Sequence, residues 1–184
     1  MLEDKVLIFK FKRGCNDALR RIYEKYRNDL LKLAIVMTND INTAEDVVQD
    51  VFVNFVRSID TIKPHGNLKQ YLMTSVANRI KNRLRDISRH PTCSDENLDK
   101  QLTDSDNPER WAILSEQLQL ISNAMTKIPL DQRQTIALHL QGDMTFRQIA
   151  KVQNASVNTI QGHYRYGIKK LRTLLNSEVT KWSR

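Results

Sequence analysis

Apolar side chains recur every three or four residues along most of this 184-residue chain, a spacing typical of helices with one buried face. In the first half, the spacing predicts helices over residues 3–12, 18–37, 41–58 and 68–86. Residues 61–67, TIKPHGN, carry a proline and a glycine and are expected to form a loop. Glycine and proline are scarce in the chain as a whole. The pattern therefore predicts an all-α fold.

The helical spacing resumes near Pro108 and predicts one helix that ends before the break at Ile128 and Pro129. A second helix is expected over residues 131–141, closed by Gly142. The apolar stripe of the first of these helices consists of Trp111, Leu114, Leu118, Ile121 and Met125.

Residues 145–175 predict a pair of helices joined by a short turn. Apolar residues recur over 146–150, the pattern breaks at 154–156, and it resumes over 157–175 with Ser156 placed to cap the second helix. Such a helix-turn-helix can place its second helix in a major groove of DNA. A plain helical hairpin with a solvated polar face is the alternative. The outward face is expected to carry polar side chains suited to base edges and phosphates: Asn158, Thr159, Gln161, His163, Arg165, Tyr166 and Lys169.

The predicted helix over residues 41–58 carries two stripes on different faces. An acidic face near a helix N-terminus can be merely solvated, because the helix dipole favours acids there. The other interpretation is a protein partner with a basic groove or helix pair, since an acidic stripe is a poor surface for DNA. The second stripe, at i, i+3, i+4 and i+7, consists of Asp46, Gln49, Asp50 and Val53. The apolar stripe, expected to be buried, consists of Ala44, Val47, Val48, Val51, Phe52, Phe55 and Val56.

The predicted helix over residues 68–86 is strongly basic outside its apolar seam. It could be a solvated basic helix, but the local charge favours a helix that lies on DNA. The seam consists of Leu68, Leu72, Val76, Ile80, Leu84 and Ile87. The polar residues, which offer both phosphate and base contacts, are Asn78, Arg79, Lys81, Asn82, Arg83 and Arg85.

Charge is distributed unevenly along the chain, whose net charge is +8. Residues 1–90 hold 17 Lys and Arg against 11 Asp and Glu, residues 91–107 hold 1 against 5, and residues 108–184 hold 11 against 5. The acidic segment lacks apolar periodicity and is expected to be a flexible linker, whose roughly 20 residues reach at most about 70 Å. We therefore expect two small basic helical domains, 1–90 and 108–184, with a polyanionic partner.

No motif for catalysis, for phosphate binding or for a metal site occurs in the sequence. Cys15 and Cys93 lack partners at ligand spacing, which fits the reducing cytoplasm. No apolar run is long enough to span a membrane, and the N-terminus lacks the continuous apolar core of a signal peptide. We expect no enzymatic activity and no cofactor.

Three segments, in this order, resemble the bacterial RNA polymerase sigma factors. AEDVVQDVF at 44–52 closely resembles the region 2.2 signature, and YLMTSVANRIKNRLRD at 71–86 is similar to regions 2.3–2.4. MTFRQIAKVQNASVNTIQGHYRYGIKKLR at 144–172 resembles region 4.2. With a short linker and no larger N-terminal extension, the chain is identified as a member of the compact extracytoplasmic-function class.

The resemblance implies a subunit that binds core RNA polymerase and directs it to promoter DNA. Residues 1–90 would be region 2, which melts the −10 element, and residues 108–184 would be region 4, which contacts the −35 element. The resemblance leaves open whether an anti-sigma factor holds this chain inactive. The acidic stripe, Asp46, Gln49 and Asp50 with Val53 beside them, would contact the β′ clamp helices of the polymerase.

The family's DNA contacts carry over by position. Residues 63–68 match the segment that captures a flipped −10 base, and Asn78 matches the family's asparagine beside it. With the polar residues of the basic helix added to these, the −10 set is Lys63, His65, Asn67, Asn78, Arg79, Asn82 and Arg83. Gln161, Gly162, His163, Arg165 and Tyr166 fall on the family's recognition-helix positions. With the other polar residues of the outward face, the −35 set is Asn158, Thr159, Gln161, Gly162, His163, Arg165, Tyr166 and Lys169. Tyr71 replaces the usual tryptophan, and Gln161 and His163 stand at positions that are often basic in the family.

A stand-alone helix-turn-helix regulator is the main rival hypothesis, with the N-terminal helices used for dimerisation or sensing. Such a regulator has no need of the acidic stripe, whereas polymerase binding does. An RNA-binding antiterminator is a third possibility, which a preference for RNA over DNA would reveal.

Overall fold

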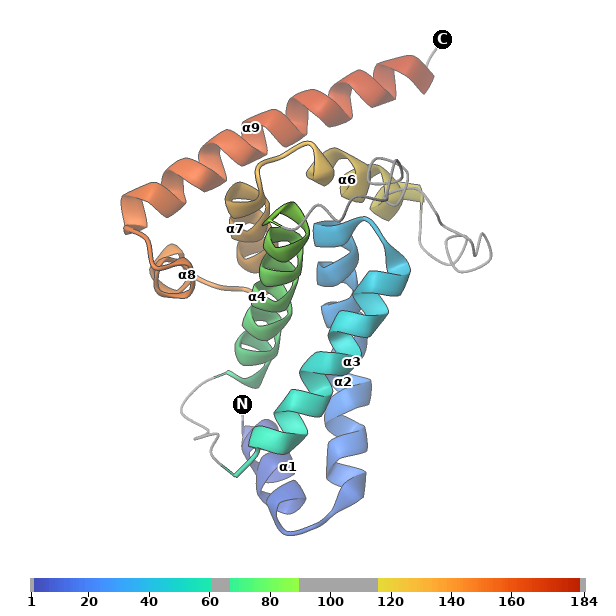
Figure 1. Ribbon diagram of the computed structural model, residues 1–184, viewed down its shortest axis with the longest axis vertical. Coiled ribbons are helices and arrows are strands. Elements are labelled where there is room, and N and C mark those ends of the chain that lie inside the picture. The colour runs from blue at the N-terminus through green and yellow to red at the C-terminus, as the bar shows by residue number, and fades with distance from the viewer. Residues whose placement is uncertain (1, 61–66, 90–115, 183–184) are drawn as a thin grey trace.

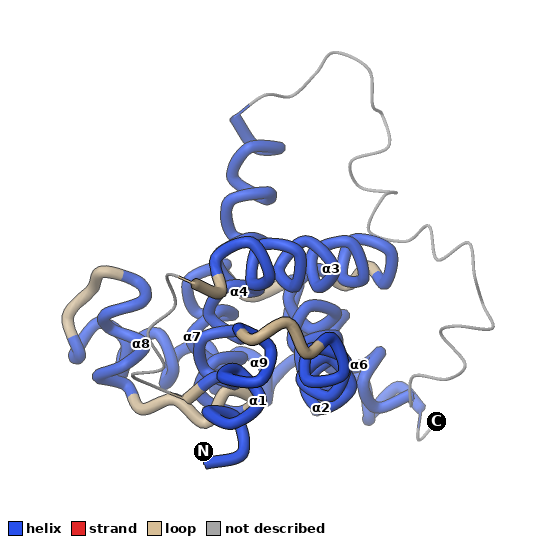
Figure 2. Tube along the Cα trace, turned by 90° about the horizontal axis from the view of Figure 1, so that it is seen from below, coloured by secondary structure: helices blue, strands red, loops and turns tan. Residues whose placement is uncertain are grey.

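The computed structural model describes residues 2–60, 67–89 and 116–182, and this part of the chain contains helices and no strand (Figures 1 and 2). The all-α prediction is therefore confirmed. The first lobe consists of α1 (Leu2–Lys12), α2 (Asn16–Thr38), α3 (Ile41–Ser58) and α4 (Leu68–Arg89). The second lobe consists of α6 (Glu116–Thr126), α7 (Leu130–Leu140), α8 (Phe146–Gln153) and α9 (Val157–Trp182). None of these helices is long and apolar enough to cross a membrane.

Side-chain caps set several helix starts. The Asp40 carboxylate accepts hydrogen bonds from the backbone N–H groups of Asn42 and Thr43 at the start of α3. Thr145 and Gln148 form a reciprocal capping box at the start of α8. Ser156 Oγ accepts the Thr159 N–H at 3.0 Å, which confirms the predicted cap of α9.

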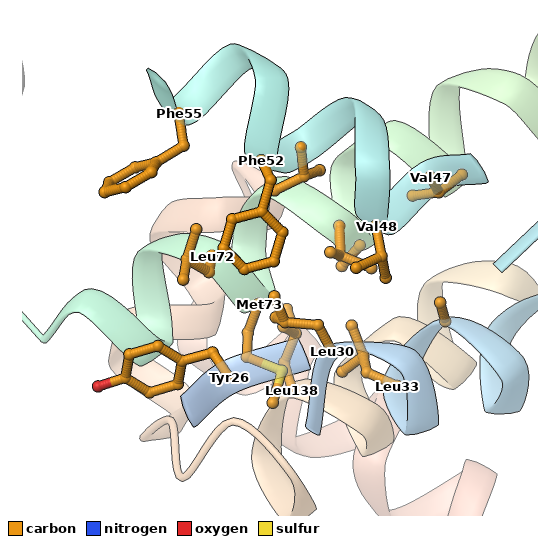
Figure 3. Close-up of a cluster of buried hydrophobic side chains, with 14 of the residues drawn as sticks. Tyr26, Leu30, Leu33, Val47, Val48, Phe52, Phe55, Leu72, Met73 and Leu138 are labelled. Atoms are coloured by element: carbon orange, nitrogen blue, oxygen red, sulfur yellow. The ribbon is translucent and has the colours of Figure 1, made fainter. Parts of the chain in front are cut away.

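The core of the first lobe follows the predicted stripes, with α2, α3 and α4 packed on one another (Figure 3). Phe52 and Phe55 of α3 are buried there, as are Leu72 and Val76 of α4. Two members of the predicted stripes lie outside the core: Val56 is 36% exposed and Ile87 is 44% exposed. The periodicity placed both on apolar faces, but no neighbouring helix covers them.

The C-terminal third of α2 is buried on every side, which the single predicted stripe did not anticipate. All six residues 33–38 are buried. Val36 packs with Met125, Ile128 and Ile136 of the second lobe, on a different side from the first-lobe core. Helix α2 thus contacts α3 of the first lobe and α6 of the second.

The buried cluster of the first lobe continues into the second. Leu138 of α7 is fully buried and lies with Leu30, Leu33 and Met73 (Figure 3). The division at residues 90 and 108 stays a prediction, and the predicted linker over 91–107 lies outside the described residues, as do Trp111 and Leu114. Among the described residues of the predicted stripe before α7, Met125 is buried but Ile121 is 37% exposed.

Substitution by alanine should change the free energy of unfolding in opposite directions at two glycines. A Cβ at Gly142, just after α7, would lie 2.7 Å from the backbone oxygen of Leu138, so Gly142→Ala should lower the free energy of unfolding by about 1–3 kcal/mol. A Cβ at Gly162, within α9, would have no atom within 4 Å, so Gly162→Ala should raise that free energy by about 0.5–1 kcal/mol. Urea denaturation followed by circular dichroism measures both. A gain in stability from Gly142→Ala would contradict the tight turn.

Candidate nucleic-acid and partner interfaces

The acidic stripe lies on the exposed face of α3. Asp46, Gln49, Asp50 and Val53 are all exposed, as the sequence predicts. Both carboxylates face cations of α4: Asp50 Oδ2 accepts Arg79 Nη2 at 2.8 Å, and Asp46 Oδ2 lies 3.9 Å from Arg83 Nη1. About half or more of each of these four side chains is exposed, so each pair contributes only about 0–1 kcal/mol. The stripe is therefore accessible to a partner at little cost.

An apolar hollow lies beside the stripe, between α2 and α3. Tyr23, Val53 and Val56 are between 36% and 41% exposed there, and the Tyr23 ring stands edge-on to Phe52 with 4.8 Å between centroids. Tyr23 falls on the helical apolar spacing of residues 18–37, and Val56 belongs to the apolar stripe expected to be buried. Both are nevertheless exposed, because periodicity cannot distinguish a covered apolar stripe from an uncovered one. The hollow is lined by Asn16, Leu19, Arg20, Tyr23, Gln49, Phe52, Val53, Val56 and Arg57.

The predicted −10 residues do not form one free surface in this structure. Arg79, Asn82 and Arg83 are exposed on α4, and two of them pair with the stripe on α3. Asn78 is half-buried, and its Oδ1 accepts a hydrogen bond from Gln134 Nε2 of α7 at 3.2 Å. Asn67 uses its Oδ1 to accept the Lys69 N–H at the start of α4. Lys63 and His65 lie outside the described residues.

Tyr71, which stands where the resembled family usually has tryptophan, is 40% exposed at the start of α4. Its ring centroid lies 6.3 Å from that of Phe55. A base could therefore stack on the open side of this ring.

The predicted −35 residues lie on the first half of α9, and most of them share its exposed face: Asn158, Thr159, Gln161, Arg165, Tyr166 and Lys169. The Thr159 hydroxyl is already engaged with Ser156 Oγ at 2.8 Å. The Arg165 guanidinium lies over the Tyr166 ring, 5.0 Å from its centroid, and Tyr166 is 58% exposed. The helix runs through Gly162 without interruption.

His163 departs from the outward face on which the sequence placed it. Its side chain is half-buried, and its Nδ1 is buried with no hydrogen-bond partner among the described residues. The hydrogen bond from Lys81 is the main cause that lowers the pKa of Asp131, and the charges of Arg85 and His163 lower it further. His163 therefore belongs to the packing between α9 and α7 in this structure.

Within the described ranges, no group of three or more His, Cys, Asp or Glu side chains is placed to hold a metal ion.

Residues 22–90 match the family model for sigma-70 region 2. The ECF RNA polymerase sigma-E factor of Haemophilus influenzae is 26% identical over 170 residues, which cover 87% of this chain and 88% of that protein. The RNA polymerase sigma-H factor of Pseudomonas aeruginosa is 25% identical over 167 residues, or 86% of each chain.

Two solved structures share the fold over nearly the whole chain. The structure of CnrH in complex with the cytosolic domain of CnrY is 20% identical, with a TM-score of 0.67, and the alignment covers 95% of this chain and 98% of that one. The sigma factor RpoE in complex with the anti-sigma factor NepR, from Bartonella quintana, is 22% identical, with a TM-score of 0.61 and coverage of 91% and 97%.

Proposed function

Because this chain is an RNA polymerase sigma factor of the extracytoplasmic-function class, we propose that it binds core RNA polymerase through α3 and directs it to promoters through α4 and α9. The sigma factor acts by binding and positioning, so none of its residues is assigned a catalytic role. We propose that it acts in the cytoplasm, where core polymerase and promoter DNA are found.

The observation that carries the proposal is the α3 surface, where an acidic stripe adjoins an apolar hollow. Asp46 and Asp50 supply negative charge, and Val53 adjoins the exposed apolar side chains of the hollow. A partner that fits must offer basic side chains around an apolar anchor, and a pair of basic helices such as the β′ clamp helices meets that requirement. DNA does not, because its phosphates would face the two carboxylates.

On α4, Asn78, Arg79, Asn82 and Arg83 would contact the −10 element together with the segment that contains Lys63, His65 and Asn67. Arginine and asparagine side chains suit phosphates and base edges, and Tyr71 offers an exposed ring for stacking. Arg79 and Arg83 can exchange their exposed carboxylate partners for phosphates at little cost.

On α9, the exposed first half would enter the major groove of the −35 element. Asn158, Gln161 and Arg165 are exposed there and can reach base edges, while Tyr166 and Lys169 suit the backbone. Thr159 and His163 contribute less in this arrangement, since one serves the helix cap and the other faces α7. Gly162 permits close approach of the helix backbone to DNA.

Base-specific and phosphate contacts on α9 should separate in a promoter-library selection at fixed salt. Gln161→Ala should relax preference at one −35 position, at a cost of about 1–3 kcal/mol there, because glutamine pairs with adenine through two hydrogen bonds. Lys169→Ala should weaken binding evenly across sequences and make the salt dependence shallower, since it removes one phosphate contact. An unchanged −35 preference in Gln161→Ala, with a change at one base in Lys169→Ala, would mean that α9 docks differently.

An anti-sigma factor is a further proposed partner. The solved structures of similar fold include a sigma factor bound to the anti-sigma factor NepR. Co-purification of the tagged chain from cells, followed by identification of the proteins bound to it, tests this partner.

Two measurements test the proposed function. Purified protein mixed with bacterial core RNA polymerase should co-elute in size exclusion at one-to-one stoichiometry, and overexpression should produce a defined set of new transcript starts with shared −10 and −35 sequences. A stand-alone regulator would elute apart from the core enzyme, and an RNA-binding antiterminator would prefer RNA in a competition assay. Either result would overturn the proposal.

A further inference from the structure

Helix α1 carries apolar side chains on two opposite faces. The inner face packs on α2 and buries Leu7 and Ile8. The outer face carries Leu2, Val6 and Phe9, which are 81%, 46% and 54% exposed. These three recur at i, i+4 and i+7, so they form one stripe along the helix. Packing of a surface helix on a core requires only one apolar face, and the outer stripe therefore needs a second explanation.

Basic side chains border this outer stripe. At about 3.6 residues per turn, Lys5 and Lys10 fall on its opposite flanks. Arg13 closes one end of the stripe, with its guanidinium 4.3 Å from the centroid of the Phe9 ring. All three cations are exposed. An apolar centre with cations around it suits a partner that is anionic at its surface and apolar beneath.

The two acidic residues of α1 do not oppose this charge, because both pair with α2. Lys25 Nζ lies 2.7 Å from Glu3 Oε2, and Arg21 Nη2 lies 3.8 Å from Glu3 Oε1. Asp4 is buried and accepts hydrogen bonds from Lys25 and Tyr26 at 2.8 Å. These contacts also attach α1 to α2, so the basic and apolar outer face keeps a set orientation.

The shape of the outer face favours a flat partner. A shallow hollow lies over the stripe, and all the residues that line it belong to α1 or to the turn that follows. A groove that holds a peptide or a helix has two walls, whereas this surface has one. Helix α1 also lies at the opposite end of the molecule from α9, so an extended surface can approach it there (Figure 1).

We propose that α1 binds the surface of a bilayer that contains anionic lipids, with Leu2, Val6 and Phe9 at the acyl boundary and the cations at the headgroups. Helices that lie in a membrane interface have this distribution of apolar and basic side chains. Lysine stems can extend along the apolar surface while their ammonium groups stay in water. The inference goes beyond the proposed function, because none of the residues that line the hollow belongs to the proposed polymerase or DNA sites.

Flotation of the full chain with lipid vesicles tests this binding. The wild type should float with mixed phosphatidylglycerol and phosphatidylcholine vesicles but not with phosphatidylcholine alone, and added salt should weaken the binding. Val6→Ser with Phe9→Ser should lower the ratio of bound to free protein roughly tenfold or more, since it removes the apolar anchor. Lys5→Glu with Lys10→Glu should have an effect of similar size, because anionic lipid then repels α1.

Matched controls come from exposed positions of the second lobe. Ile121→Ser with Leu140→Ser also removes two exposed apolar side chains. Lys127→Glu with Lys151→Glu makes the same change in net charge. Both variants should float as the wild type does, and circular dichroism should show unchanged helix content in every variant.

Phe9→Trp measures insertion separately. Vesicles with brominated acyl chains should quench the fluorescence of this variant more than that of the wild type, because the new indole enters the acyl boundary. Equal quenching would overturn the proposal, as would absence of flotation. Flotation that survives Val6→Ser with Phe9→Ser would mean adsorption of the basic chain as a whole and would also overturn it.

A protein partner is the other outcome that would contradict the proposal. In that case the wild type would ignore vesicles but retain an acidic protein from a lysate, and Val6→Ser with Phe9→Ser would lose it. Core polymerase takes no part in these measurements, so their failure leaves the proposed function standing.

Discussion

Reversal of the charge at Asp46 and Asp50 to arginine should abolish stable binding to core RNA polymerase while the helical fold persists. Both side chains are exposed on α3, away from its buried face, so the substitution adds no charge to the core. Close charge pairs across an interface couple by about 1.5–7 kcal/mol each, so two reversals should weaken binding by about 3 kcal/mol or more, which is over 100-fold. Size exclusion with core polymerase, at physiological salt, measures the effect.

Two controls separate repulsion between the new arginines and the polymerase from changes within the first lobe. Reversal at Asp46 and Asp50 also breaks the ion pairs with Arg83 and Arg79. Adding Arg79→Asp and Arg83→Asp re-forms those pairs with the opposite polarity, and polymerase binding should still be lost. Asp17→Arg with Asp60→Arg makes the same change in net charge at exposed positions outside the hollow and should bind normally. Co-elution of the Asp46→Arg, Asp50→Arg variant with core polymerase would show that α3 is not the surface that binds the polymerase.

Asn78→Ala should slow promoter opening by about 10- to 100-fold while leaving polymerase binding unchanged. Extrusion of a base costs a few kcal/mol, which contacts to the flipped base must offset, and loss of one such hydrogen bond costs about 1–3 kcal/mol. A template with a pre-melted bubble over the −10 element needs no such extrusion and should restore much of the activity. Permanganate footprinting and run-off transcription on both templates measure this.

Gln134→Ala is the matched control that the structure supplies. It removes the same hydrogen bond between Gln134 and Asn78, but it leaves the Asn78 amide free for DNA. Promoter opening should therefore be at least as fast as in the wild type. Equal defects in Asn78→Ala and Gln134→Ala, on both templates, would mean that Asn78 serves the packing of the lobes and not DNA.

Helix positions could be predicted from the sequence because they depend on residues that are close together along the chain. The predicted helix over residues 41–58 coincides with α3, whose start is fixed by Asp40 and whose buried face follows from the spacing of its apolar residues. The same holds for the turn between α8 and α9, where Asn154 adopts a left-handed conformation and Ser156 caps the next helix. These features involve residues within one turn of each other.

Tertiary structure alone decided which apolar faces are covered and which polar side chains are free. Periodicity marks Tyr23 and Val56 as apolar-face residues, but their exposure depends on whether another helix happens to lie over them. His163 turns inward because α7 packs beside α9, and Asn78 is engaged because Gln134 comes from more than fifty residues away in sequence. Burial of residues 33–38 on every side has the same origin, since two lobes meet there. The sequence specified the helices and the polar and charged side chains that they carry. Contacts between segments distant in sequence determined which of those side chains are exposed in the free protein.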